Sequence, residues 1–153
     1  MKQAIAITRE GIAKGNSPFG AIVVKNGKVI SSTHNTVWHD TDPTAHAEVN
    51  AIRRAAKAIS NIDLTGTVMY TTCEPCPMCL SAIHWAKIDR VVYGATIADA
   101  AGAGFNELHV DAEKLAQLGG SKLQVERLNS ESVNRECAGL FTEWKQAAKC
   151  GTY

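Results

Sequence analysis

The sequence lacks a long apolar run. No stretch approaches the roughly 18 apolar residues that a membrane-spanning helix needs. The first 16 residues, MKQAIAITREGIAKGN, are interrupted by charged side chains and contain no apolar core of the kind found in signal peptides. We therefore expect a protein that neither enters a membrane nor is secreted, with the cytoplasm as its location.

The sequence also lacks an excess of charge and an even set of cysteines. Its 16 basic and 15 acidic residues give a formal net charge of +1, whereas proteins that coat phosphate backbones usually carry a basic excess. A nucleic-acid partner is thus not expected, although the balanced net charge is compatible with a small local basic patch. Five cysteines without a secretion signal argue against a disulfide framework. Three of them fall within residues 73–79, which indicates metal or redox chemistry.

The length of 153 residues suits one compact domain covering residues 1–153. Hydrophobic periodicity and turn residues predict strands and helices along the whole chain. The order of these elements predicts an α/β protein with three layers, in which helices cover both faces of a five-stranded mixed sheet. The predicted elements are a helix over 3–14, a hairpin over 19–35 with its turn at 26–27, helices over 45–59 and 77–87, strands over 67–72 and 89–95, a Gly- and Ala-rich loop through 105, a helix over 111–118, a strand over 122–128 and a helix over 133–148.

The segment CEPCPMC, residues 73–79, carries the strongest local signal. If a helix begins near Pro77, Cys76 and Cys79 lie in its first turn, where the helix dipole stabilises thiolates. Two such thiolates form half of a tetrahedral zinc site, but the same spacing also occurs in redox pairs and in structural four-cysteine sites. Cys73 is either a third thiolate or a strand residue packed beneath the site, and we favour packing.

His46 is the better third ligand. It begins the preceding predicted helix, and Glu48 follows two residues later. Two thiolates and one imidazole leave one position of a zinc ion open for water, whose pKa then falls toward about 7. The pattern H-x-E followed by P-C-x-x-C is the signature of zinc deaminases, in which the glutamate is the general acid and base rather than a ligand.

Four segments carry a more specific resemblance: NSPFGAIVV, DPTAHAEVNAIR, YTTCEPCPMCLSAIHWAK and DAAGAGFNE. Together they resemble the guanine deaminase and guanosine deaminase group of the cytidine and deoxycytidylate deaminase superfamily. The resemblance implies a cytidine-deaminase-like fold, a bound Zn²⁺ and a homodimer. The ending Gly104-Phe105-Asn106-Glu107 is more similar to guanine-type enzymes than to tRNA adenosine deaminases.

The resemblance also implies roles for residues outside the metal motif. Asn35 would hydrogen-bond the base, and the backbone of Ala47 would contact a carbonyl group. Glu107 would read ring N–H groups and assist proton transfer, in keeping with a carboxylate that only accepts hydrogen bonds. The aromatic residues would enclose the base, as two walls and a C-terminal cover: Phe19, Trp85 and Tyr153.

We therefore expect a zinc-dependent hydrolase that converts guanine to xanthine and ammonia. A zinc-bound hydroxide would attack the amino-bearing carbon while Glu48 moves the protons. Guanosine or another nucleobase or nucleoside is an alternative substrate. A tRNA adenosine deaminase and a non-catalytic, zinc-stabilised binding module are the remaining alternatives.

Overall fold

The computed structural model describes residues 1–147 and 151–153, and its strands form one mixed sheet. The strands are β1 (Gly20–Lys25), β2 (Lys28–His34), β3 (Thr67–Cys73), β4 (Arg90–Ala95) and β5 (Gln124–Arg127). Among the described residues they lie in the order β2-β1-β3-β4-β5. β1 pairs antiparallel with β2 and β3, whereas β4 is parallel to both β3 and β5. The predicted five-stranded mixed sheet is therefore confirmed.

The hairpin of β1 and β2 turns where the sequence predicts. Asn26 and Gly27 connect the strands, and their φ angles are 50° and 73°. Two positive φ angles are typical of the tight turn whose twist matches that of paired strands, and asparagine followed by glycine tolerates them best. The hairpin sets Gly20, at the start of β1, opposite His34, at the end of β2.

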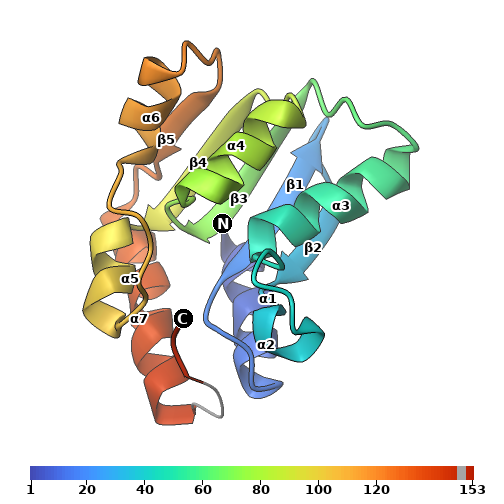
Figure 1. Cartoon of the computed structure of the whole chain (residues 1–153). Helices are drawn as coiled ribbons and strands as arrows, with labels where there is room; N and C mark the ends of the chain where they lie inside the picture. The colour runs from blue at the N-terminus through green and yellow to red at the C-terminus, as the bar shows by residue number, and fades with distance from the viewer. Residues whose placement is uncertain (148–150) are drawn as a thin grey trace.

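Helices cover both faces of the sheet, as predicted (Figure 1). Alternation along β2 separates the two faces, because successive side chains of a strand point in opposite directions. The hydroxyl of Thr33 donates to the carbonyl of Ala47 on one face, whereas the ring of His34 packs against Gly11 on the other. The helices are α1 (Lys2–Ala13), α2 (Val37–Asp40), α3 (Ala47–Ile59), α4 (Pro77–Trp85), α5 (Ile97–Ala103), α6 (Ala112–Leu118) and α7 (Glu131–Ala147).

One prediction was wrong: the Gly- and Ala-rich segment before Phe105 is not all loop. It contains α5, which begins with a capping box in which Thr96 and Asp99 bind each other's backbone amides. Ile97, Ala100 and Ala103 are buried at helical spacing. Capping and a small apolar face thus outweigh the low helix propensity of the glycines. The short helix α2 was also not predicted.

Other boundaries differ by a few residues. α3 begins at Ala47 rather than 45, α4 ends at Trp85 rather than 87, and α7 begins at Glu131 rather than 133. The predicted end of the last helix at Ala148 lies outside the described residues, as does Cys150. Within residues 1–147 and 151–153, no helix combines the length and the apolar character that crossing a bilayer requires.

Gly94 in β4 tests how tightly α7 packs on the sheet. A Cβ atom at this position would lie 2.7 Å from the Cβ of Cys137 in α7 and closer still to its sulfur. We expect Gly94→Ala to lower the free energy of unfolding by about 1–3 kcal/mol, because extra atoms in a packed core force displacement. Urea denaturation measures the change.

Gly102→Ala is the matched control, because nothing lies within 4 Å of a Cβ at that helical position. It should leave stability unchanged or raise it by up to about 1 kcal/mol, since alanine favours helix. Equal losses of stability in the two variants would contradict the proposed packing at Gly94.

Candidate metal centre and pocket

The topology of the sheet gathers the predicted site residues at one edge. β3 and β4 are parallel and pair Cys73 with Ala95 at their carboxyl ends. β1 is antiparallel to β3, and the amide of Gly20 at its start donates to the hydroxyl of Thr72. The hairpin then brings the end of β2, followed by Asn35, to the same edge, where the amide of Asn35 donates to the carbonyl of Phe19.

Two helix N-termini meet at this edge. His46 is the N-cap of α3 and Cys76 is the N-cap of α4, and both have extended backbones, with ψ angles of 155° and 165°. An N-cap residue lies half outside its helix, so its side chain is not restricted to a helical face. Cys79, one turn into α4, is fully buried beside them. The first helical position of α4 is Pro77, which needs no hydrogen-bond acceptor there.

The three predicted ligands form a compact cluster. Their ligand atoms all lie within 4.8 Å of one another. The Nδ1 atom of His46 is 3.7 Å from the sulfur of Cys76 and 3.5 Å from that of Cys79. Zinc bond lengths and a tetrahedral angle require sulfur and nitrogen ligands to be about 3.6 Å apart. The cluster therefore fits a zinc ion, with the imidazole bound through Nδ1.

The three ligand side chains shift one another's pKa values. Hydrogen bonding from Cys79, and secondly from His46, lowers the pKa of Cys76 to about 4 although burial opposes this. The pKa of Cys79 is raised, because Cys79 donates to Cys76 and is buried. Burial would lower the pKa of His46, but the neighbouring anionic groups, Cys76 first, raise it. Cys76 is thus a thiolate, the form of cysteine that binds metals.

Glu48 lies beside the ligands, in the first turn of α3, and is 5% exposed. Its Oε1 atom accepts a hydrogen bond of 2.9 Å from Thr71 of β3, and its Oε2 atom lies 3.5 Å from the sulfur of Cys79. Burial raises the pKa of Glu48, and the charge of Cys76 adds to this, while His46 opposes it. A carboxyl group held next to the metal ligands with a raised pKa suits proton transfer.

Asn35 and Tyr153 lie together at the mouth of this site. Asn35 is 1% exposed, and its Oδ1 atom accepts from the amide of Val37. Its Nδ2 atom donates to the hydroxyl of Tyr153 over 2.6 Å. The ring of Tyr153 is centred 5.8 Å from that of His46. The described end of the chain thus lies beside the metal ligands of the same chain.

Glu107 also faces the metal centre. One of its carboxylate oxygens is buried and has no hydrogen-bond partner among the described residues. Burial raises the pKa of Glu107 to about 8, and the negative charges of Cys76 and Glu48 contribute. A buried polar atom without a partner is costly unless something absent from the free protein satisfies it. This oxygen is therefore a candidate contact for a ligand.

The three remaining predicted residues differ in placement. The carbonyl of Ala47 accepts from Thr33, while its amide, at the first position of α3, has no partner within the helix. Phe19 is buried and packs edge-on against Phe105, whose ring lies 5.7 Å from that of Tyr153. Phe19 thus reaches the pocket through Phe105, which sequence reasoning did not single out.

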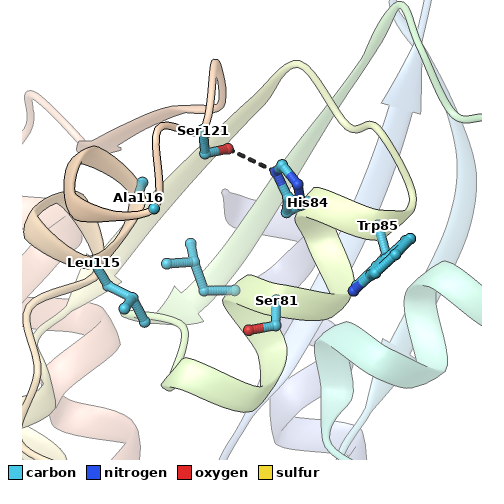
Figure 2. Close-up of a pocket in the computed structure, with 8 residues that line it drawn as sticks. Ser81, His84, Trp85, Leu115, Ala116 and Ser121 are labelled. Carbon is cyan, nitrogen blue, oxygen red and sulfur yellow. Dashed lines mark hydrogen bonds between the residues drawn. The ribbon is translucent and has the colours of Figure 1, made fainter.

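Trp85 is not placed with the other site residues. It ends α4, far from the N-terminal ligands, and its side chain is 83% exposed. Figure 2 shows it on a groove between α4 and α6, near His84, whose ring bonds the hydroxyl of Ser121. The prediction that Trp85 forms a wall around the base does not hold within this chain. The two ends of α4 lie at different surfaces, and Trp85 is at the end away from the metal ligands.

Removal of single ligands tests the metal centre. The wild-type protein should hold about one zinc ion per chain after dialysis, whereas Cys76→Ser and His46→Ala should lose it. Cys73→Ser is the control, since the sulfur of Cys73 is directed at the carbonyl of Thr96, 3.5 Å away. Atomic absorption measures the zinc content. If Cys73→Ser lost zinc while Cys76→Ser and His46→Ala kept it, Cys73 would be a metal ligand and the assigned ligand set would be wrong.

Comparison with known proteins agrees with this geometry. A family model described as the cytidine and deoxycytidylate deaminase zinc-binding region matches residues 1–95. The chain is 46% identical over 114 residues to a guanine deaminase from Bacillus subtilis, a match that covers 74% of this chain and 73% of that protein. It is 41% identical over 95 residues to a tRNA-specific adenosine deaminase from Aquifex aeolicus, covering 62% of this chain and 63% of that one.

Among solved structures, a guanine deaminase from Nitrosomonas europaea superimposes with a TM-score of 0.85. The superposition covers 95% of this chain and 82% of that one at 24% identity, so it supports the fold alone. The family match includes all three metal ligands and Glu48, while Glu107 and Tyr153 lie beyond it. By its sequence, its fold and its metal centre, the chain belongs to the cytidine and deoxycytidylate deaminase family.

Proposed function

We propose that this single-domain protein is a zinc-dependent guanine deaminase. The reaction consumes guanine and water and yields xanthine and ammonia. The observation that carries the proposal is the buried, unpartnered carboxylate oxygen of Glu107 next to a three-ligand metal centre. Three protein ligands are typical of catalytic zinc, and a purine with N–H groups on its edge offers the donors that Glu107 lacks.

Glu48 is the group that moves protons. A bound zinc ion supplies a nucleophile at neutral pH because it lowers the pKa of water. Glu48 would take a proton from that water and give it to a ring nitrogen of the base. It would then take the remaining proton from the hydroxyl group added to the carbon and give it to the departing amino group, so that ammonia leaves and a carbonyl forms. Thr71 holds the carboxylate in place during both transfers, through a hydrogen bond of 2.9 Å to its Oε1 atom.

Base recognition falls to groups around the metal centre. Glu107 accepts hydrogen bonds from ring N–H groups through its buried oxygen, which has no partner among the described residues. The free amide of Ala47 donates to a carbonyl oxygen of the base. Asn35 is held by Val37 and Tyr153, so its amide already has a fixed orientation. Sites that hydrogen-bond a purine edge discriminate strongly against bases that lack the matching groups.

Tyr153 is proposed as the cover of the pocket. It bonds Asn35 through its hydroxyl, and its carbonyl oxygen accepts from the amide of Asn106, next to Glu107. Trp38 of α2 holds the same tail through a 3.0 Å hydrogen bond to the carbonyl of Gly151. Exclusion of water by such a cover strengthens the electrostatic interactions inside the site.

The resemblance further supports a homodimer that acts in the cytoplasm on a small purine. A tRNA adenosine deaminase is the second candidate, and one surface feature favours it. A groove beside α3 is lined by basic side chains, with Asp40 as an acidic neighbour. Basic grooves attract phosphate backbones. The basic residues are Lys14, Arg53, Arg54 and Lys57.

A substrate panel separates the candidates. Ammonia release should be fastest with guanine and slower with guanosine, cytosine, cytidine and adenine, because Glu107 is matched to the N–H groups of guanine. An anticodon stem-loop of tRNA should not be deaminated. If guanine were not deaminated and the tRNA stem-loop were, the proposed function would be wrong and RNA editing would be the function instead.

Glu48→Gln isolates proton transfer from metal binding. The amide has nearly the same shape but cannot exchange the proton, so we expect zinc to stay bound and kcat to fall by about 10²- to 10⁴-fold. Glu113→Gln, an exposed acidic residue in the first turn of α6, is the control and should keep full activity. Normal turnover by the Glu48 variant would remove this residue from the mechanism.

A further inference from the structure

Glu74 is a buried acidic residue that the proposed mechanism does not use. It lies in the turn between β3 and α4, amid the cysteines of the metal motif, and is 6% exposed. Its backbone amide donates to the carbonyl of Ala95 over 2.8 Å, which fixes the turn against β4. Within the described residues, no lysine or arginine pairs with its carboxylate. A buried carboxylate in this position must therefore be satisfied by other donors.

Those donors are two backbone amides that are 15 positions apart in the sequence. The Oε2 atom accepts from the amide of Ile97 over 3.2 Å, and the Oε1 atom accepts from the amide of Ala112 over 2.9 Å. Ile97 is the first residue of α5 and Ala112 is the first residue of α6. Amides at these positions have no partner inside their helices, so one carboxylate satisfies an orphan donor of each.

The segment between the two amides carries the pocket residues Phe105 and Glu107. Beyond α5 it is held by the packing of Phe105 against Phe19 and Tyr153 and by a hydrogen bond from the amide of Asn106 to the carbonyl of Tyr153. The side chains of Asn106, Leu108 and His109 are exposed. Gly104 has no side chain to pack and has a positive φ angle of 106°. Phe105 is its only fully buried residue between α5 and α6 among those described. The two bonds of Glu74 therefore fix both ends of this segment, while the packing of Phe105 holds its middle.

We propose that Glu74 is a positioning residue that sets the place of Glu107 relative to the metal ligands. The carboxylate joins the turn that carries Cys76 to both ends of the segment that carries Glu107. One side chain thus links the metal centre directly to the segment of the base-reading group. The inference rests on the proposed function for the role of Glu107, but the anchoring itself is independent of it.

The pattern of donors explains why a carboxylate is needed. Both oxygens of glutamate accept hydrogen bonds, whereas glutamine offers one acceptor and one donor group. In Glu74→Gln the NH₂ group must face a backbone N–H group, so one of the two bonds is lost. Glu74→Asp keeps both acceptors but shortens the side chain by one carbon, so it tests reach instead of chemistry.

Hydrogen exchange on the zinc-loaded protein tests the anchoring. In Glu74→Gln, peptides covering residues 97–112 should exchange about 10- to 100-fold faster, as expected when a hydrogen bond to a charged group is lost. Peptides from β1 and β2 should be unchanged. Glu113→Gln, in the first turn of α6, is the control for a general loss of negative charge and should leave exchange unaltered.

The exchange result decides the anchoring even without a substrate. Unchanged exchange over 97–112 in Glu74→Gln would overturn the proposal, and so would faster exchange throughout the sheet in both Glu74→Gln and Glu74→Asp, which would mean a global structural role. If the wild-type protein did not deaminate guanine, the proposed function would fail while this measurement kept its meaning.

A double-mutant cycle tests the link to Glu107. Glu74→Gln should lower kcat/KM for guanine by about 10- to 100-fold with zinc retained, mainly through KM, because a misplaced Glu107 weakens base binding. In a Glu107→Gln background the same change should cost less than about threefold, since residues that act as a unit are not additive. Effects that multiply fully would show that Glu74 acts independently of Glu107 and would refute the positioning role.

Discussion

The structure depends on the convergence of two helix N-termini at one edge of the sheet. His46 and Cys76 cap α3 and α4, and Cys79 lies one turn farther along α4. The separations of 3.5 and 3.7 Å between imidazole nitrogen and sulfur arise because both helices begin beside the end of β3. Helix N-termini are positive and favour anionic ligands. The same placement therefore stabilises a thiolate and orients it toward a metal ion.

This convergence concentrates buried acidic groups that a protein interior would normally exclude. Glu48, Glu74 and Glu107 lie at or near the site, and the pKa values of Glu48 and Glu107 are raised by burial first and by neighbouring negative charge second. Removing charges from water is costly unless they are paired. A zinc ion held by His46, Cys76 and Cys79 would compensate the acidic groups nearest to it, whereas the backbone amides of Ile97 and Ala112 compensate Glu74.

The pocket is completed by parts of the chain that are distant in sequence. Phe19 precedes β1, Phe105 follows α5 and Phe141 belongs to α7. The ring of Phe19 packs edge-on against the other two, and the rings of Phe105 and Phe141 are centred 6.1 Å apart at a tilt. Tyr153 extends this group toward His46. The aromatic cluster is part of the main hydrophobic core and supports the segment that holds Glu107. The residues proposed to read the base therefore depend on packing between layers, whereas the metal ligands and Glu48 lie in two short motifs.

The sequence by itself determined the order of most elements, the hairpin turn and the metal ligands, because these follow from local periodicity, glycine geometry and the spacing of His46, Cys76 and Cys79. It did not reveal α5, whose cap and small buried face are weak signals within a glycine-rich stretch. Only the tertiary structure decided that Trp85 is exposed and that Glu74 joins two distant amides. Those outcomes depend on which surfaces meet, and a sequence states local preferences without stating which of its distant segments will become neighbours.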